Sequence, residues 1–421
     1  MIEKMARNRR NVRRIRSIKE VLTNRNFFII IGILIVIIII CTGIYNYQRY
    51  LDKQEIAKEK ETIEKQSQEV FTKMNEAITR ANQNISNSDV LITMSAVGDI
   101  LCSQEMLDDA YQSEKGEYDF SHMFTNVTDY VKGADIVMGT METCVSEGEY
   151  NSENAPREFA QAVSNTGINV VSISHNHSLD RGLTGLTETK NNLEEMGFLV
   201  VGDKIDTPRA VEMQEVKNTK IAFLTYTCFV DEQDKKTDKE LSAINLYSEE
   251  QAKSDIEYAK KEGADYICVL IHWGDALSTT VSDEQRQIAG FLVENGADLI
   301  LGSHPSVVQP MEVVQNKQGK NVFIAYSIGT FISTLSSEDA RTELILNIEL
   351  IKSEGEVYLN KVDYTPIYVL DNGTEAENRI ELIDMKGAIN SYNPELLNTI
   401  TRETYDKLVS GLNRLNGVLA Q

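Results

Sequence analysis

Three short stretches of the chain carry the residue types that most often do chemistry in proteins. They are residues 174–180 (Ser-His-Asn-His-Ser-Leu-Asp), 272–275 (His-Trp-Gly-Asp) and 302–305 (Gly-Ser-His-Pro), and each follows an apolar run typical of a β-strand. Four of the five histidines in the chain lie in them. Histidine is the commonest metal ligand and the usual acid–base group near neutral pH. Histidines concentrated at strand ends therefore predict a single site.

The polar residues at these and other strand ends form one candidate set. In open α/β sheets, ligands bind beyond the carboxyl ends of the strands. The set combines carboxylate, amide and imidazole groups: Asp99, Glu142, Asn176, His177, Asp180, His272 and His304. These donors suit a divalent metal such as Mn, Fe, Zn or Mg. Two such ions could clamp a phosphoryl oxygen and generate a hydroxide nucleophile.

Each residue taken alone also has a simpler interpretation. Asp99 follows a glycine and could be a turn residue, and His272 next to Trp273 could be a satisfied core histidine. His177 and Asp180 with the serine between them could belong to a Ser/His/Asp triad, but triad members normally converge from separate elements. The joint pattern is much more specific than any of its parts.

Strands and helices alternate through the middle of the chain, which predicts an α/β domain with buried, largely parallel strands. Strands are expected at 91–97, 134–139, 170–174, 198–201, 220–227, 266–272 and 298–302. Helices are expected at 156–165, 186–196, 248–262 and 283–295. After Gln309 the pattern favours antiparallel strands at 311–314, 322–327, 342–351 and 357–368, and then a helix around Pro394–Leu415.

The N-terminus predicts a membrane anchor. Residues 1–26 form a basic arm, and the uncharged apolar run 27–45 is close to the roughly 20 residues that cross a bilayer. No small-residue cleavage site follows the run, so a cleaved signal peptide is not favoured. Because basic flanks stay in the cytoplasm, we expect a single-pass protein of the cell membrane with its main domain outside. A buried core helix is the alternative.

The formal net charge is −22 although the N-terminus is basic. This charge argues against nucleic acid as a partner of the outer part. It also means that a polyanionic substrate must be held locally by metal or basic groups.

Four further segments follow the basic arm: the transmembrane helix (27–45), a stalk or linker (46–90), the main domain (91–370) and a C-terminal extension with a helix (371–421). Near-helical spacing of apolar residues in 48–88 predicts a helical stalk, which either self-associates or is a solvated single helix. Four cysteines fall outside the anchor, and they could pair as disulfides or be small buried hydrophobes: Cys102, Cys144, Cys228 and Cys268.

Six motifs in order give the chain a recognisable family resemblance. They are Val-Gly-Asp-Ile-Leu (97–101), Gly-Thr-Met-Glu (139–142), Asn-His-Ser-Leu-Asp-Arg-Gly (176–182), His-Trp-Gly (272–274), the segment 296–305 with Gln309, and Tyr-Ser-Ile-Gly-Thr-Phe (326–331). Over about 93–333 the chain resembles the CapA (PgsA) family of bacterial capsule and poly-γ-glutamate synthesis proteins. The resemblance implies a calcineurin-like metallophosphoesterase fold, a two-sheet sandwich flanked by helices.

The resemblance also implies roles for the candidate residues. Asp99, Glu142, Asn176, His272 and His304 match positions that would hold metal. His177 matches the histidine that acts as an acid or contacts the leaving oxygen, and Asp180 matches the acid that orients it. The implied partners are the membrane, a capsule-type anionic polymer such as poly-γ-glutamate, and other subunits of a capsule synthesis complex.

The chain departs from the family pattern at several positions. Ser306 stands where the family has a second histidine of His-Pro-His, Ala276 where it has an acid, and Thr330 where it has an asparagine. His175 replaces an asparagine and would point away from the site if its segment were extended. The expected function is a metal-dependent hydrolase or transferase. The alternatives are a non-catalytic subunit with a degenerate metal site, or an extracellular phosphodiesterase.

Overall fold

The computed structural model describes residues 25–85, 90–396 and 400–421, so almost all of the expected basic arm lies outside the described residues. The chain divides into two compact units, residues 1–62 and residues 63–421. The first unit holds most of helix α2 (Arg25–Val70). Among the described residues, one helix is long and apolar enough to cross a membrane, judged by length and composition, and it begins at Phe27. This finding is consistent with a single-pass anchor.

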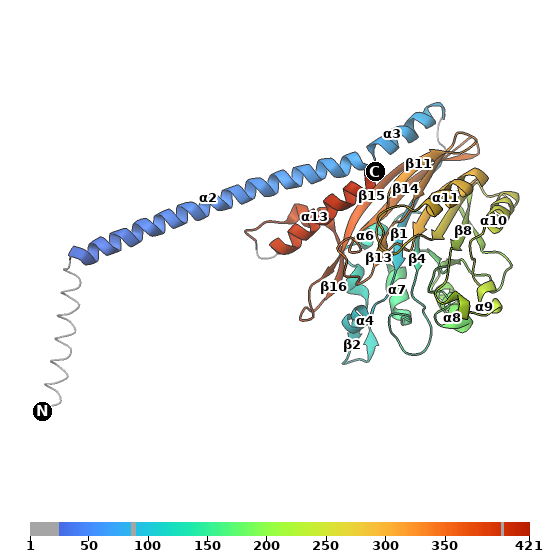
Figure 1. Cartoon of the computed structure of the whole chain (residues 1–421), viewed down its shortest axis with the longest axis horizontal. Helices are drawn as coiled ribbons and strands as arrows, with labels where there is room; N and C mark the ends of the chain where they lie inside the picture. The colour runs from blue at the N-terminus through green and yellow to red at the C-terminus, as the bar shows by residue number, and fades with distance from the viewer. Residues whose placement is uncertain (1–24, 86–89, 397–399) are drawn as a thin grey trace. The chain divides into compact units, whose positions relative to one another are not determined.

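Two β-sheets form the frame of the second unit (Figure 1). The first sheet runs β16-β15-β14-β1-β4-β5-β6, with β13 paired to β1. Its strands are β1 (Val90–Ile100), β4 (Ile136–Met141), β5 (Val170–Ser172), β6 (Leu199–Val201), β13 (Thr330–Ile332), β14 (Thr342–Ser353), β15 (Glu356–Asp371) and β16 (Ile380–Asp384). The second sheet runs β11-β12-β10-β9-β8-β7. Its strands are β7 (Val211–Val216), β8 (Thr219–Thr227), β9 (Tyr266–His272), β10 (Leu299–Ser303), β11 (Met311–Gln315) and β12 (Asn321–Ala325).

Parallel pairing dominates the centre of both sheets. Strands β1, β4, β5 and β6 are parallel neighbours in the first sheet, and β8, β9, β10 and β12 are parallel neighbours in the second. The expected α/β class is therefore confirmed. The antiparallel pairing expected after Gln309 holds for β11 with β12 and for β14 with β15. It does not describe the whole region, because β12 also pairs in parallel with β10 and β13 pairs in parallel with β1.

The two sheets pack face to face, as the sandwich expectation requires. Cys268 of β9 lies against Met138 of β4, with their sulfur atoms 3.8 Å apart. The hydroxyls of Ser172 and Thr225, also from opposite sheets, are 2.8 Å apart. On the outer faces, α7 (Arg157–Asn165) and α8 (Gly182–Glu195) pack on the first sheet, and α10 (Glu249–Lys261) and α11 (Asp283–Asn295) pack on the second (Figure 1). The two-sheet sandwich flanked by helices is confirmed.

Local sequence sets the ends of α11 and hence the start of β10. Ser282 accepts the Gln285 backbone N–H, and the Gln285 side chain bonds back to the Ser282 backbone, which makes a capping box. The helix ends at Gly296, whose φ of 110° lies in the left-handed region that glycine adopts without strain. The chain then turns directly into β10, the strand that precedes His304.

The remaining elements complete the second unit. They are α3 (Thr72–Ala81), η1 (Asn82–Asn84), α4 (Gln104–Ala110), β2 (Tyr111–Gln112), β3 (Glu117–Tyr118), α5 (Ser121–Phe124), α6 (Thr128–Val131), η2 (Gln233–Lys235), α9 (Asp238–Ser242), α12 (Met385–Ser391) and α13 (Arg402–Leu419). Strand β16 extends the first sheet beyond β15, so residues after 371 contribute to the same sheet. The terminal helix begins at Arg402, capped by Thr401, rather than near Pro394.

The second half of the expected stalk packs on the domain. Ile78 of α3 is fully buried, and Phe71 lies edge-on to Tyr364 of β15 at 5.4 Å between ring centroids. The Asn75 side chain donates to the Val362 carbonyl and accepts from the Val362 N–H. Residues 72–81 are therefore held by buried apolar contacts and backbone hydrogen bonds, and are not a solvated helix.

The cysteines do not pair in the structure. Cys102, Cys144, Cys228 and Cys268 are all free, and three of them are buried. Burial raises the pKa of Cys144 to about 11 and that of Cys228 to about 12. Of the two alternatives, the structure favours small buried hydrophobes over disulfide partners.

Candidate metal centre

The candidate ligands stand at the carboxyl ends of strands from both sheets. They are Asp99 in β1, Glu142 after β4, Asn176 after β5, His272 at the end of β9 and His304 after β10. The first three strands belong to the first sheet and the last two to the second. Because parallel strands present their carboxyl ends at one edge, the facing sheets bring these residues together.

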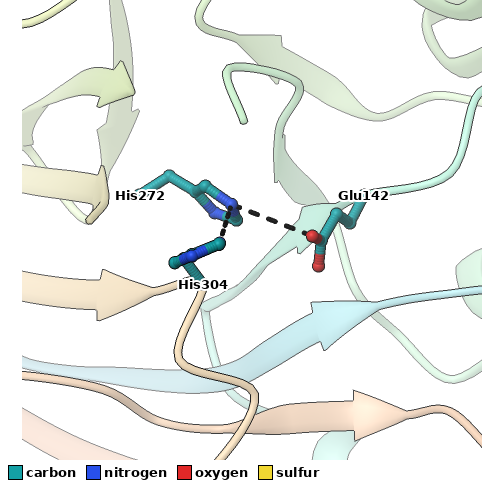
Figure 2. Close-up of side chains that lie close together, drawn as sticks. All are labelled: Glu142, His272 and His304. Carbon is teal, nitrogen blue, oxygen red and sulfur yellow. Dashed lines mark hydrogen bonds and ion pairs between the residues drawn. The ribbon is translucent and has the colours of Figure 1, made fainter. Parts of the chain in front are cut away.

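Glu142, His272 and His304 form the tightest group, which we call the Glu142–His272–His304 cluster. Each residue offers one ligand atom, and these atoms all lie within 4.8 Å of one another. Nε2 of His272 is 3.2 Å from Nδ1 of His304 and 3.8 Å from Oε1 of Glu142. Figure 2 shows the three side chains pointing toward one another. Two imidazole nitrogens and a carboxylate oxygen at this spacing could hold a transition-metal ion.

The two ring nitrogens of His272 have different surroundings. Nε2 faces the cluster and also lies 2.7 Å from Oδ1 of Asn176. Nδ1 lies 2.9 Å from the Ser303 hydroxyl. If Nδ1 carries the proton and donates to Ser303, Nε2 is left as the ligand atom, which is the usual arrangement of a metal-binding histidine. The amide oxygen of Asn176 thus faces the same nitrogen of His272 as Glu142 and His304 do.

Asp99 lies on the other side of the His272 ring. Its Oδ1 is 3.8 Å from Nδ1 of His272, and its Oδ2 accepts the backbone N–H of His304 at 2.9 Å. The side chain is fully buried, and Oδ1 has no hydrogen-bond partner among the described residues. Asp99 thus orients the His304 backbone with one oxygen, while its other oxygen faces the His272 ring.

Burial dominates the electrostatics of the centre. It raises the pKa of Asp99 to about 7. It also raises the pKa of Glu142 well above its usual range, and the nearby Asp99 raises it further. Burial lowers the pKa of His272 well below its usual value and lowers that of His304. Buried carboxyls with unpartnered oxygens beside neutral imidazoles are a donor set that a divalent cation would stabilise. The residues present therefore fit a divalent metal.

His177 stands at the mouth of the centre with two carboxylates. Its Nδ1 is 2.8 Å from Oδ2 of Asp180 and 3.4 Å from Oδ2 of Asp231. The hydrogen bond to Asp180 is the main cause that raises the pKa of His177, against an opposing effect of burial. His177, Asp180, Asp231 and Glu142 line one pocket of about 660 Å³. A protonated imidazole here could donate a proton to a group bound beside the cluster.

Asp231 was missing from the residues proposed from sequence. Besides its contact with His177, its Oδ1 accepts from the Asn176 side chain at 3.1 Å, and its N–H donates to the Asn176 carbonyl. These bonds turn the Asn176 amide oxygen toward His272. Asp231 follows the apolar pair Phe229-Val230, the same strand-end pattern that marks the other sites, but it lies beyond the end of β8 and carries no motif.

His175 does not meet the condition under which its ring would point away from the site. The segment after β5 is bent at residue 175 and not extended, so the ring does not point away from the site. Its centroid lies 6.0 Å from that of His272. Burial lowers the pKa of His175 to about 3, so the ring is neutral. Within the described residues its Nδ1 has no hydrogen-bond partner.

The His304–Ser306 turn carries backbone strain. His304 has φ of 93° and Ser306 has φ of 55°, both in the region that favours glycine. Such strain persists only where the surroundings hold it, and it is found mostly at functional sites. The Ser306 hydroxyl donates to the His304 carbonyl at 3.1 Å. The Ser306 side chain therefore stabilises the turn through this hydrogen bond and provides no imidazole at this position.

The chain matches a known protein family over more than half of its length. Residues 93–335 match the model of the family described as bacterial capsule synthesis protein PGA_cap. Two curated relatives are a capsule biosynthesis protein CapA of Bacillus anthracis, 28% identical over 254 residues, and a PGA biosynthesis protein CapA of Bacillus subtilis (strain 168), 26% identical over 277 residues. The matches cover 57% and 63% of this chain, and 59% and 70% of the relatives.

Similar solved structures include two bacterial proteins. The calcineurin-like phosphoesterase YfkN of Bacillus subtilis is 15% identical, with a TM-score of 0.41 over 79% of this chain and 99% of that one. A 5'-nucleotidase precursor of Thermus thermophilus is 13% identical, with a TM-score of 0.43 over 79% of this chain and 60% of that one.

Proposed function

The chain belongs to the family of bacterial capsule synthesis proteins, and on that premise we propose that it is a metal-dependent hydrolase or transferase acting on an anionic capsule polymer such as poly-γ-glutamate. The observation that carries the proposal is the Glu142–His272–His304 cluster beside a protonatable His177. Capsule biosynthesis relatives supply the polymer class, and the donor set supplies the metal dependence.

The chemistry divides between the centre and its mouth. A divalent ion in the centre would supply a Lewis acid that activates water or an acceptor hydroxyl or amine. Glu142, His272 and His304 would hold it, with Asn176 and Asp99 as further donors. His177 donates a proton to the leaving group, and Asp180 orients that imidazole and favours its charged form. The negative charge at the mouth disfavours binding of a polyanion without accompanying cations. Besides Glu142, four carboxylates line this mouth: Glu153, Asp180, Asp231 and Glu232.

The purified full-length chain in detergent is the direct test of this activity. Elemental analysis after purification without chelator should find a bound transition metal. Incubation with poly-γ-glutamate should change its size distribution or create new chain ends, and EDTA should abolish that change. A wild-type chain without metal would reject the proposal. If the metal-loaded chain acts on phosphodiesters but not on poly-γ-glutamate, the proposed substrate is wrong and the proposed metal centre stands.

The apolar helix motivates a proposal about location. We infer that the chain is anchored in the cell membrane by residues 27–45, with its basic arm in the cytoplasm and the domain outside, where it meets polymer and other subunits of a capsule synthesis complex. Protease added to intact cells should therefore degrade residues after Ser88 and spare the arm. Permeabilised cells provide the control. Protection of the domain from protease in intact cells would contradict the proposed orientation.

One observation favours a second candidate function. Ser306 occupies the position where the family resemblance leads one to expect an imidazole, and its hydroxyl donates to the His304 carbonyl. A centre with one ligand fewer could belong to a non-catalytic subunit of a polymer synthesis or export complex. The capsule phenotype of a His177 variant, described in the Discussion, separates the two.

A further inference from the structure

A turn beside the centre, residues 326–330, connects the two sheets. It follows β12 of the second sheet and leads into β13, which pairs with β1 of the first. The Ile328 N–H donates to the Gly302 carbonyl of β10 at 3.1 Å. The Gly329 carbonyl accepts the Asp99 N–H of β1 at 3.0 Å. The same turn therefore touches the strand that leads to His304 and the strand that carries Asp99.

The turn is packed tightly between β1 and β14. Gly329 has φ of 73°, which favours glycine, and a Cβ there would overlap the carboxyl group of Glu343 in β14. On the opposite side, a Cβ on Gly98 of β1 would overlap the Gly329 carbonyl. The turn is thus a single backbone layer between the end of β1 and the Glu343 side chain.

Glu343 is an unusual residue to find in this place. Its side chain is fully buried, and neither carboxyl oxygen has a hydrogen-bond partner of good geometry among the described residues. Burial raises the pKa of Glu343 well above its usual range, and the Thr330 backbone amide opposes the shift only in part. A buried polar group without partners is costly and calls for an explanation.

We propose that Glu343 is a positioning residue for the metal centre, which packs the 326–330 turn against the ends of β1 and β10 and so sets Asp99 and His304 relative to each other. The His304 N–H donates to Oδ2 of Asp99 at 2.9 Å, so a shift of the turn moves both residues. The expected effect of Glu343 on metal affinity rests on the proposed function. Its expected effect on the order of the 326–330 turn does not.

Three variants of the full chain in detergent test the proposal. Glu343→Ala removes the packing, and Glu343→Gln keeps the shape of a neutral carboxylic acid. Leu350→Ala is the matched control, because Leu350 is fully buried on the same strand seven residues further along. Hydrogen–deuterium exchange measures the order of segments 96–101 and 326–332, and titration with Mn²⁺ measures metal affinity.

Glu343→Ala should raise deuterium uptake in both segments and weaken Mn²⁺ binding by about 10–100-fold, the usual effect of losing a residue that supports a metal ligand. Glu343→Gln should restore both to near the wild-type values. Leu350→Ala should lower global stability but change neither. Wild-type uptake in Glu343→Ala, or a glutamine variant as impaired as alanine, would overturn the proposal. A wild type that binds no Mn²⁺ would reject the proposed function, while the exchange comparison would still decide the role of Glu343.

Discussion

Replacing His272 by alanine is expected to weaken metal binding by the full-length chain severely. Nε2 of His272 is the atom nearest to the other donors, at 2.7 Å from Asn176, 3.2 Å from His304 and 3.8 Å from Glu142. Its loss should lower affinity by more than the roughly 10–100-fold typical of a supporting residue. Elemental analysis and Mn²⁺ titration measure the effect. Combining the change with His304→Ala should leave no measurable binding.

The control for this prediction is the one histidine outside the candidate site. His122 is paired with Asp109 at 2.8 Å, and its side chain is 19% exposed. His122→Ala removes an imidazole without touching the cluster and should keep wild-type metal content. Because His272 is buried, alanine leaves a cavity, so His272→Gln should be compared by circular dichroism and thermal unfolding. Full metal content in a folded His272 variant would refute the assigned ligand.

Replacing His177 by alanine is expected to lower the catalytic rate by about 10²–10⁴-fold, the usual contribution of a positioned acid–base group. Metal content should stay unchanged, because His177 lies at the mouth and outside the Glu142–His272–His304 cluster. The rate is measured with poly-γ-glutamate or with a phosphodiester, whichever the wild type accepts. A His177→Ala variant as fast as the wild type would show that His177 is not the proton donor.

The pH profile gives a second readout of the same residue. The pKa of His177 is raised, chiefly by its hydrogen bond to Asp180, so the proton-donating form persists above the usual histidine range. Activity should fall as the pH rises through this raised pKa. Asp180→Asn removes the main cause and should move the alkaline limb of kcat/KM to lower pH. Asp231→Asn should move it less, because Asp231 is a smaller cause of the shift.

Capsule assembly in cells decides between enzyme and scaffold. A catalytic role predicts that the His177→Ala strain loses capsule as a deletion strain does. A scaffold role predicts a normal capsule in the His177→Ala strain and none in the deletion strain. The comparison is informative because His177→Ala changes an accessible side chain, 38% exposed, and should not disturb the fold.

Much of the frame could be predicted from local sequence. The apolar run 266–272 and the helix 283–295 were expected with the bounds that the structure has. Both have strong local signals, an unbroken apolar run in the first and a capping box with a terminal glycine in the second. Parallel pairing accounts for polar residues gathering at one edge of each sheet, and the packing of the two sheets brings the two groups together. The stalk was less predictable, since only tertiary contacts with β15 show that α3 is packed.

The sequence by itself determined that an α/β sheet edge would gather imidazole, amide and carboxylate groups, because strand periodicity places the residue after each strand at that edge. Only the tertiary structure decided how they divide: Asp99 faces Nδ1 of His272, while Glu142, Asn176 and His304 face Nε2. It also decided that Asp231 and Glu343 lie near the centre. Side-chain direction after a strand end depends on turn conformation, and long-range packing sets that conformation. No local pattern encodes such contacts between residues far apart in the chain.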